Sequence, residues 1–133
     1  MKTEAQQQSV LAARTTGLTT KKIALLTVCT DPADPATWTE APDVATTNRP
    51  TVAFNAGGVT NDDTNNRAQV TWPAADMEIT LASGATIVRL AICEGTGALS
   101  SAARSVSDSA FSVAVAAGGK LRIPANSQTC TEQ

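Results

Sequence analysis

The chain has 133 residues, a net charge of −2, and neither His nor Tyr. Because His is the usual general acid or base near neutral pH, this composition argues against an enzyme, and we expect no catalytic residue, no cofactor and no small-molecule substrate. The weak negative charge, without a basic stripe, argues against a nucleic-acid partner, and no segment is apolar over the length that a membrane span requires.

Residues 1–20 are expected to form an N-terminal arm or a short helix. Good helix formers fill residues 3–14, and Thr3 is a suitable cap. Only Val10, Leu11 and a few alanines offer an apolar face, so the helix would be marginal in isolation. We therefore expect this segment to become ordered against something else.

The segment 21–30 is the strongest strand in the sequence, because it is apolar almost throughout and rich in β-branched residues. Its continuous apolarity predicts a central strand. Asp31 and Pro32 end it, and residues 31–48, with three prolines, are expected to form the longest irregular connection. Connections of this length are usually functional or form interfaces.

Shorter strands follow, separated by turns such as the Gly-rich segment 117–119. We predict them over residues 49–54, 68–73, 86–93, 110–115 and 120–124, with a weaker strand pattern over 98–106. This pattern predicts an all-β domain over residues 21–126, a β-sandwich of jelly-roll or Greek-key type, followed by a polar C-terminal tail at 127–133.

The three cysteines are too scattered for a metal site. Cys29 and Cys93 lie in apolar runs and are expected to be core residues with free thiols, although a disulfide between them is the alternative. Cys130 is expected to be exposed in the tail. The polar segment 61–66 lacks the Gly and the final Glu of a calcium loop, which favours a solvated turn, and we predict no metal.

Two carboxylates, Asp76 and Glu78, have the spacing of one strand face, but only Trp72 is near them in sequence as a sugar platform, which argues against a glycosidase. Trp72 alternates with apolar residues and is expected in the core. Arg89 interrupts an apolar strand, so it either faces an edge or another subunit, or pairs with Asp76 or Glu78.

Interface candidates are chosen from the irregular segments and from charges within apolar surroundings. Trp38 is the foremost, since tryptophan is enriched at interface hot spots and this one lies in the long connection. The full set of predicted interface residues is Trp38, Arg49, Arg89, Val10, Leu11 and Arg14.

The order of several short motifs resembles a known family. These motifs are Ile23-Ala24-Leu25-Leu26-Thr27-Val28-Cys29-Thr30-Asp31-Pro32, the segment 65–75 with its Trp72-Pro73, the segment 87–94, and the segment 115–125 around Gly118-Gly119. Over roughly residues 20–126 the chain resembles small virion proteins of tailed bacteriophages, labelled tail-fibre-like or capsid cement (decoration) proteins. It departs from them where Thr46-Thr47-Asn48-Arg49 replaces a Gly-Gly-Tyr-Ala-Arg stretch and where Trp72 replaces Phe.

The resemblance implies a β-sandwich or jelly-roll fold and a cement protein on the outer surface of the capsid. Its partners would be the major capsid protein and further copies of itself, with which it would form a homodimer or homotrimer. The protein would be made in the host cytoplasm. Residues 1–20 and 31–48 would extend over neighbouring subunits. A tail or tail-fibre component involved in host attachment is the alternative, and the family supplies no catalytic residue to carry over.

Overall fold

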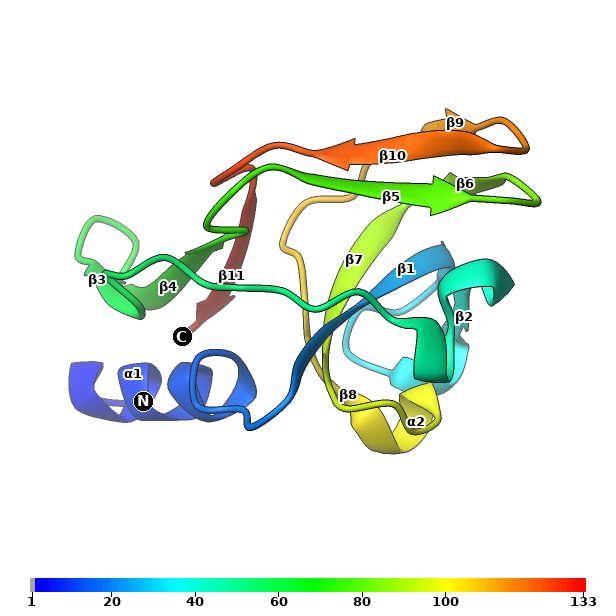
Figure 1. Cartoon of the computed structure of the whole chain (residues 1–133). Coiled ribbons are helices and arrows are strands. Elements are labelled where there is room, and N and C mark those ends of the chain that lie inside the picture. The colour runs from blue at the N-terminus through cyan, green and yellow to red at the C-terminus, as the bar shows by residue number, and fades with distance from the viewer. Residues whose placement is uncertain (1) are drawn as a thin grey trace.

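A computed structural model describes residues 2–133. Within this range the chain folds into antiparallel strands with a short N-terminal helix, which confirms the predicted all-β class (Figure 1). The elements are α1 (Glu4–Arg14), β1 (Lys21–Cys29), β2 (Trp38–Glu40), β3 (Thr60–Asp62), β4 (Arg67–Trp72), β5 (Met77–Leu81), β6 (Ala85–Ile87), β7 (Arg89–Glu94), α2 (Leu99–Ala102), β8 (Ala103–Val106), β9 (Val113–Val115), β10 (Gly119–Ile123) and β11 (Gln128–Glu132).

The strands from β4 to β11 pair in a nested order. β7 pairs with β8, β6 with β9, β5 with β10 and β4 with β11, all antiparallel. The chain therefore reverses at α2 and forms a double-stranded ribbon. This ribbon is bent, so that β5 and β10 lie above β7 (Figure 1). Nested pairing of this kind is the arrangement of a jelly-roll ribbon.

β1 attaches to this ribbon along β7, with Leu25 opposite Leu90, and β2 adds to the far side of β1. The result is a four-stranded sheet in the order β2-β1-β7-β8. The predicted central position of β1 is confirmed. Its two faces are both covered, because Ile23 and Leu25 enter the main core while Ala24 enters a second apolar cluster on the other face of the sheet.

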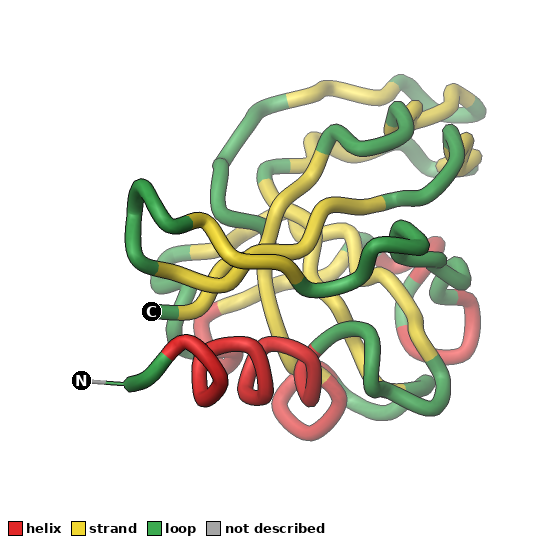
Figure 2. The backbone as a smooth tube through the Cα atoms, turned by 90° about the vertical axis from the view of Figure 1, so that its left-hand side faces the viewer, coloured by secondary structure: helices red, strands yellow, loops and turns green. Residues whose placement is uncertain are grey.

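The helix α1 is ordered against the chain itself. Thr3 and Gln6 form a capping box at its start, and Leu11 is only 1% exposed where the helix packs against β4 and β11. Lys2 and Arg14, at opposite ends of the helix, both contact the carboxylate of Glu132, at 2.6 and 3.0 Å. Figure 2 shows the helix lying beside the strands rather than projecting from them, so residues 4–14 are not an extended arm.

The C-terminal segment corrects a second expectation. Residues 127–133 were predicted as a polar tail with Cys130 exposed, yet Gln128–Glu132 is strand β11, and Cys130 is fully buried. Pairing with β4 supplies this order, because backbone hydrogen bonds do not depend on side-chain polarity. The thiols of Cys29, Cys93 and Cys130 are all free, as expected for the first two.

Several further strand boundaries differ from the prediction, including that of the segment 110–115, where β9 begins only at Val113. The segment 86–93 divides at Val88, whose backbone bonds to Leu26 and Phe111 carry the chain from one pairing partner to the next. The segment 98–106 is the helix α2 followed by β8, and 49–54 is reduced to a single bridge between Thr51 and Lys22.

Candidate functional site

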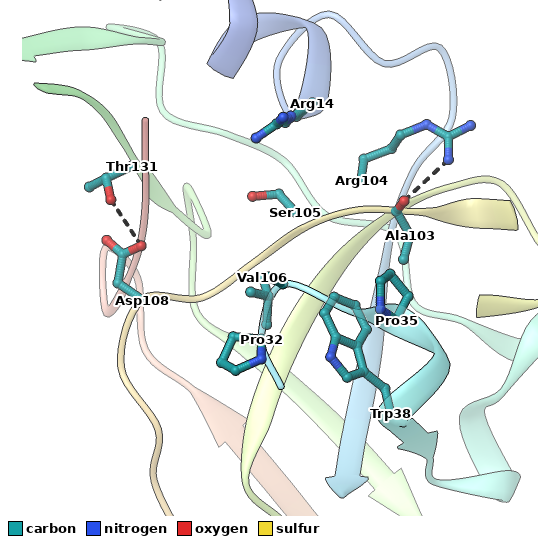
Figure 3. Close-up of a pocket in the computed structure, with 11 residues that line it drawn as sticks. Arg14, Pro32, Pro35, Trp38, Ala103, Arg104, Ser105, Val106, Asp108 and Thr131 are labelled. Atoms are coloured by element: carbon teal, nitrogen blue, oxygen red, sulfur yellow. Dashed lines mark hydrogen bonds between the residues drawn. The ribbon is translucent and has the colours of Figure 1, made fainter. Parts of the chain in front are cut away.

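A groove of about 550 Å³ opens where α1, the loop 31–38, β8 and β11 meet (Figure 3). We call it the β8 groove. The loop 31–38 and β8 contribute four side chains each, and α1 and β11 contribute one each. The lining residues are Arg14, Pro32, Ala33, Pro35, Trp38, Ala103, Arg104, Ser105, Val106, Asp108 and Thr131.

One wall of the β8 groove is the loop 31–38, which local hydrogen bonds hold in shape. The carboxylates of Asp31 and Asp34 accept hydrogen bonds from backbone N–H groups two residues further on, at 2.9 and 3.0 Å. The indole Nε1 of Trp38 donates to the carbonyl of Asp31 at 2.8 Å and ties the end of the loop to its beginning. Pro32 and Pro35 are thereby fixed on the rim.

The opposite wall is formed by β8 and β11, which meet at one end of the groove. The N–H of Asp108 donates to the carbonyl of Thr129 at 2.9 Å, and the hydroxyl of Thr131 donates to the Asp108 carboxylate at 3.1 Å (Figure 3). Burial raises the pKa of Asp108 above its ordinary value, and the Thr131 hydrogen bond opposes this effect. Asp108 nevertheless remains exposed to solvent at this part of the groove.

Two arginines also line the groove. Arg14 projects from the last turn of α1 and remains 50% exposed although it contacts Glu132. Arg104 lies in β8 at an irregularity of the β7–β8 ladder, where Ser105 pairs with Ile92 and Ala103 with Cys93, so that Arg104 is skipped. Such a bulge redirects the side chain of the extra residue, which here is exposed.

The structure brings two of the predicted interface residues, Arg14 and Trp38, into this groove. Trp38 corrects the prediction in part, because it is only 9% exposed and most of its ring packs in the second apolar cluster. Val10 is half-buried on α1. Leu11 lies in the main core, so it is not available as an interface residue.

Arg49 was predicted at an interface and is instead an internal residue. It is 2% exposed, and its guanidinium donates to both carboxylate oxygens of Glu40, at 2.7 and 2.9 Å, and to the carbonyl of Gly95. The hydrogen bond to Glu40 raises the pKa of Arg49. A two-point contact of this kind compensates a guanidinium that burial would otherwise leave without a counter-charge.

Arg89 also finds its partners within the chain. It donates to the carbonyls of Ser107 and Asp108, at 2.5 and 3.1 Å, and neither predicted carboxylate contacts it. Asp76 pairs with Arg122 and Glu78 with Lys120 on the distant β5–β10 ribbon. Carbonyls just after β8 therefore take the place of the predicted intramolecular acid.

The groove residues that the sequence prediction missed include Arg104, Asp108 and Thr131. They come from β8, from the loop after it and from β11, so no local motif unites them. The one available signal was Arg104 itself, a charge within a weak strand pattern.

Burial or internal contacts shift the pKa of several thiol and carboxylate groups. Burial raises the pKa of the Cys93 and Cys130 thiols to about 11, which keeps both protonated at neutral pH. Hydrogen bonds from Asn65 and Arg67 lower the pKa of Asp62, whose carboxylate pairs with Arg67 at 2.9 Å. Over residues 2–133 no three acidic or thiol side chains gather as a metal site.

Within the same residues no helix has both the length and the apolarity needed to cross a bilayer. Comparisons of the sequence and structure with protein-family models, curated proteins and solved structures found no match.

Proposed function

We propose that this chain is a structural protein of a tailed-bacteriophage virion, a capsid cement protein that binds the outer surface of the major capsid lattice. The observation that carries the proposal is where the resembling motifs lie. The segment 23–32 covers most of β1, and the segments 65–75, 87–94 and 115–125 contain β4, β7 and β10, three strands of the nested ribbon. The resemblance thus follows the framework of the fold rather than scattered loops.

In the proposed mechanism, each copy of the folded chain bridges neighbouring capsid subunits. Since α1 is packed on β4 and β11, contacts with neighbouring capsid subunits are made by fixed surfaces such as the β8 groove and not by residues 4–14 as a free arm. A symmetric lattice offers many equivalent sites, so modest affinity per copy is enough for full coverage. Self-association as a dimer or trimer would match the lattice symmetry axes.

The test is the molar ratio of this chain to the major capsid protein in purified virions of the source phage, by quantitative mass spectrometry with labelled standard peptides. A ratio near one, or a simple fraction of one, is the result expected for a cement protein. A handful of copies per particle would replace the proposal with a tail or tail-fibre component. Absence from the particle would overturn the virion assignment altogether.

Binding in vitro gives a second test. Capsids freed of this chain and mixed with the purified protein should recover it at the same ratio in co-sedimentation. Unexpanded proheads of the same phage are the matched control, because a cement protein that stabilises the mature shell binds that state preferentially.

A further inference from the structure

Strand β9 forms an unpaired edge in the structure. It pairs with β6 on one side, with Ala114 opposite Thr86, and no other strand within residues 2–133 pairs with it. Residues 112–114 and 116–118 are exposed. Figure 1 shows β9 at the upper margin of the molecule, with β6 beneath it. The backbone N–H and C=O groups along the outer side of β9 are therefore accessible to another strand.

β9 lacks the charges that the other sheet edges carry. Residues 109–119 contain no charged side chain. Among the strands at sheet edges within residues 2–133, each one except β6 and β9 has at least one charged side chain, and β6 packs beside β1. The charged edge residues are Glu40, Asp62, Glu78, Arg104, Lys120, Arg122 and Glu132. Because charged side chains at an edge oppose pairing with a second chain, β9 is the edge at which such pairing is not opposed.

Exposed apolar surface accompanies this edge. Val113 is 41% exposed, and it lines a cleft of about 310 Å³ that reaches Leu121 and Ile123 of the main core. The charged residue in this lining, Arg122, is already bound to the carboxylate of Asp76 at 2.9 Å. The surface beside β9 therefore offers apolar contacts to a partner and no unpaired charge.

The charge pattern favours a second copy of this chain as the partner. When two identical antiparallel strands pair about a two-fold axis, residues equally far from the axis on either side lie opposite each other. An axis at the middle of β10 would put Lys120 opposite the partner's Arg122, and like charges directly opposite destabilise a sheet. An axis at Ala114 in β9 puts Val113 opposite the partner's Val115, and pairs of β-branched side chains stabilise a sheet.

We infer that β9 pairs with the β9 strand of a second copy, antiparallel and about a two-fold axis at Ala114. The two β6–β9 pairs then form one sheet in the order β6-β9-β9-β6, and the second copy covers the exposed Val113. The inference rests on the self-association in the proposed function and gives it a surface. It selects a dimer over a trimer, because antiparallel pairing of one edge joins two copies only.

The first experiment uses the wild-type chain alone. Sedimentation velocity over about a hundredfold range of protein concentration should show a monomer giving way to a dimer. Hydrogen exchange at the backbone amides of residues 113–115 should slow as the dimer forms, while exchange at β2 and β3, two of the charged edges, stays unchanged. A monomer throughout, a trimer, or slower exchange at another edge would overturn the inference.

Charge substitutions at Ala114 test the position of the axis. This side chain is exposed, so its replacement leaves the core intact. Ala114→Lys alone and Ala114→Asp alone should each lower the dimer affinity at least about fivefold, because two like charges then lie side by side. An equimolar mixture of the two variants should recover the dimer, since the charges at the axis become opposite. A mixture that dimerises no better than either variant would overturn the pairing at Ala114.

Val113 and Val28 give a matched pair, since their exposed fractions are similar, at 41% and 45%. Val113→Lys should lower the dimer affinity at least about fivefold, whereas Val28→Lys, near the end of β1, should change it less than about twofold. Unshifted NMR resonances away from the substituted strand report that each variant is folded. Equal weakening by both variants would overturn the assignment to β9.

Co-sedimentation of the wild-type chain with capsids freed of it separates this inference from the proposed function. A chain that stays monomeric in solution and still saturates the capsids would overturn the β9 dimer and leave the cement function standing. A β9 dimer that binds no capsid would support the pairing and remove the cement function. Slower exchange at residues 113–115 only in the presence of capsids would assign this edge to the capsid protein and overturn the second copy as partner.

Discussion

The two apolar clusters on opposite faces of the β2-β1-β7-β8 sheet are built differently. The main core inside the ribbon uses Leu, Ile and Val side chains with Trp72. The outer cluster is small and consists of Ala24, Leu26, Trp38, Ala91, Cys93 and Ala102. Small residues on the outer face let the irregular loop 31–38 and the single-turn helix α2 approach the strands closely. A sheet face lined by small side chains can thus be covered by a loop, whereas a face lined by large side chains requires a second layer of strands.

Leu25 and Leu26 give the sharpest test of this difference, because they are adjacent, equally buried and point to opposite faces. We expect Leu25→Ala to lower the free energy of unfolding by about 4 kcal/mol and Leu26→Ala by about 2 kcal/mol, since the loop over the outer face can partly fill the cavity. Urea denaturation at equilibrium measures both. An equal or larger loss for Leu26→Ala would contradict the comparison.

The buried Arg49–Glu40 pair holds the cover of the outer cluster in place, because Glu40 ends β2 and Arg49 also reaches Gly95. Arg49→Met leaves the Glu40 carboxylate, 7% exposed, without its partner and should cost about 3 kcal/mol. The double variant Arg49→Met with Glu40→Met should recover to within about 1 kcal/mol of wild type. If the double variant does not recover its stability, the ion pair itself holds the loop in place, and the loss in Arg49→Met is not only the cost of leaving Glu40 unpaired.

The helix α1 covers one end of the main core through Leu11 and through Glu132, which contacts basic residues at both helix ends. Glu132→Gln should lower the free energy of unfolding by about 1 kcal/mol or less, because both partners are exposed. Hydrogen exchange of the α1 amides should accelerate while exchange in β1 and β7 stays unchanged. Uniform acceleration would mean that the helix is part of the main cooperative unit.

Asp108, which lines the β8 groove beside Thr131, should give the smallest effect. Its pKa is raised in the folded state, so the folded protein binds a proton more readily than the unfolded chain and loses stability as the pH rises through that pKa. Asp108→Asn keeps an acceptor for Thr131 and should be more stable than wild type at pH 7 by a few tenths of a kcal/mol after solvent screening. Thermal melts should show this gain disappearing as the pH falls. A gain that persists at low pH would contradict the pKa assignment.

The sequence predicts the elements whose apolar pattern is strong. β4 alternates strictly, with Ala68, Val70 and Trp72 buried, and β1 is continuous because both its faces are covered. The pattern fails for β11, where Cys130 is the one buried residue among polar neighbours, and at Val88, where the chain changes pairing partner without Gly or Pro. Partner strands, and not local residues, decide both cases.

The candidate site was predictable only in part, for the same reason. Arg14 and Trp38 stand out as a charge and an aromatic residue in weakly patterned segments, and both reach the groove. Arg49 stands out equally, yet its bond to Glu40 turns it inward. Sequence shows which charges need partners, but the nested pairing decides whether those partners are internal.

The nested ribbon also has a consequence for how the chain folds. Among the nested pairs, β7 and β8 are the closest in sequence, and each outer pair, from β6–β9 to β4–β11, is joined by a longer stretch of chain than the pair inside it. We expect these pairs to form from the inside outward. Each closure then spans a short remaining loop, so the entropy cost of joining distant segments is met in small steps, as in a zipper. We expect the α2 end to nucleate folding, with α1 docking last on the finished β4–β11 pair, the two termini being the final parts to become protected.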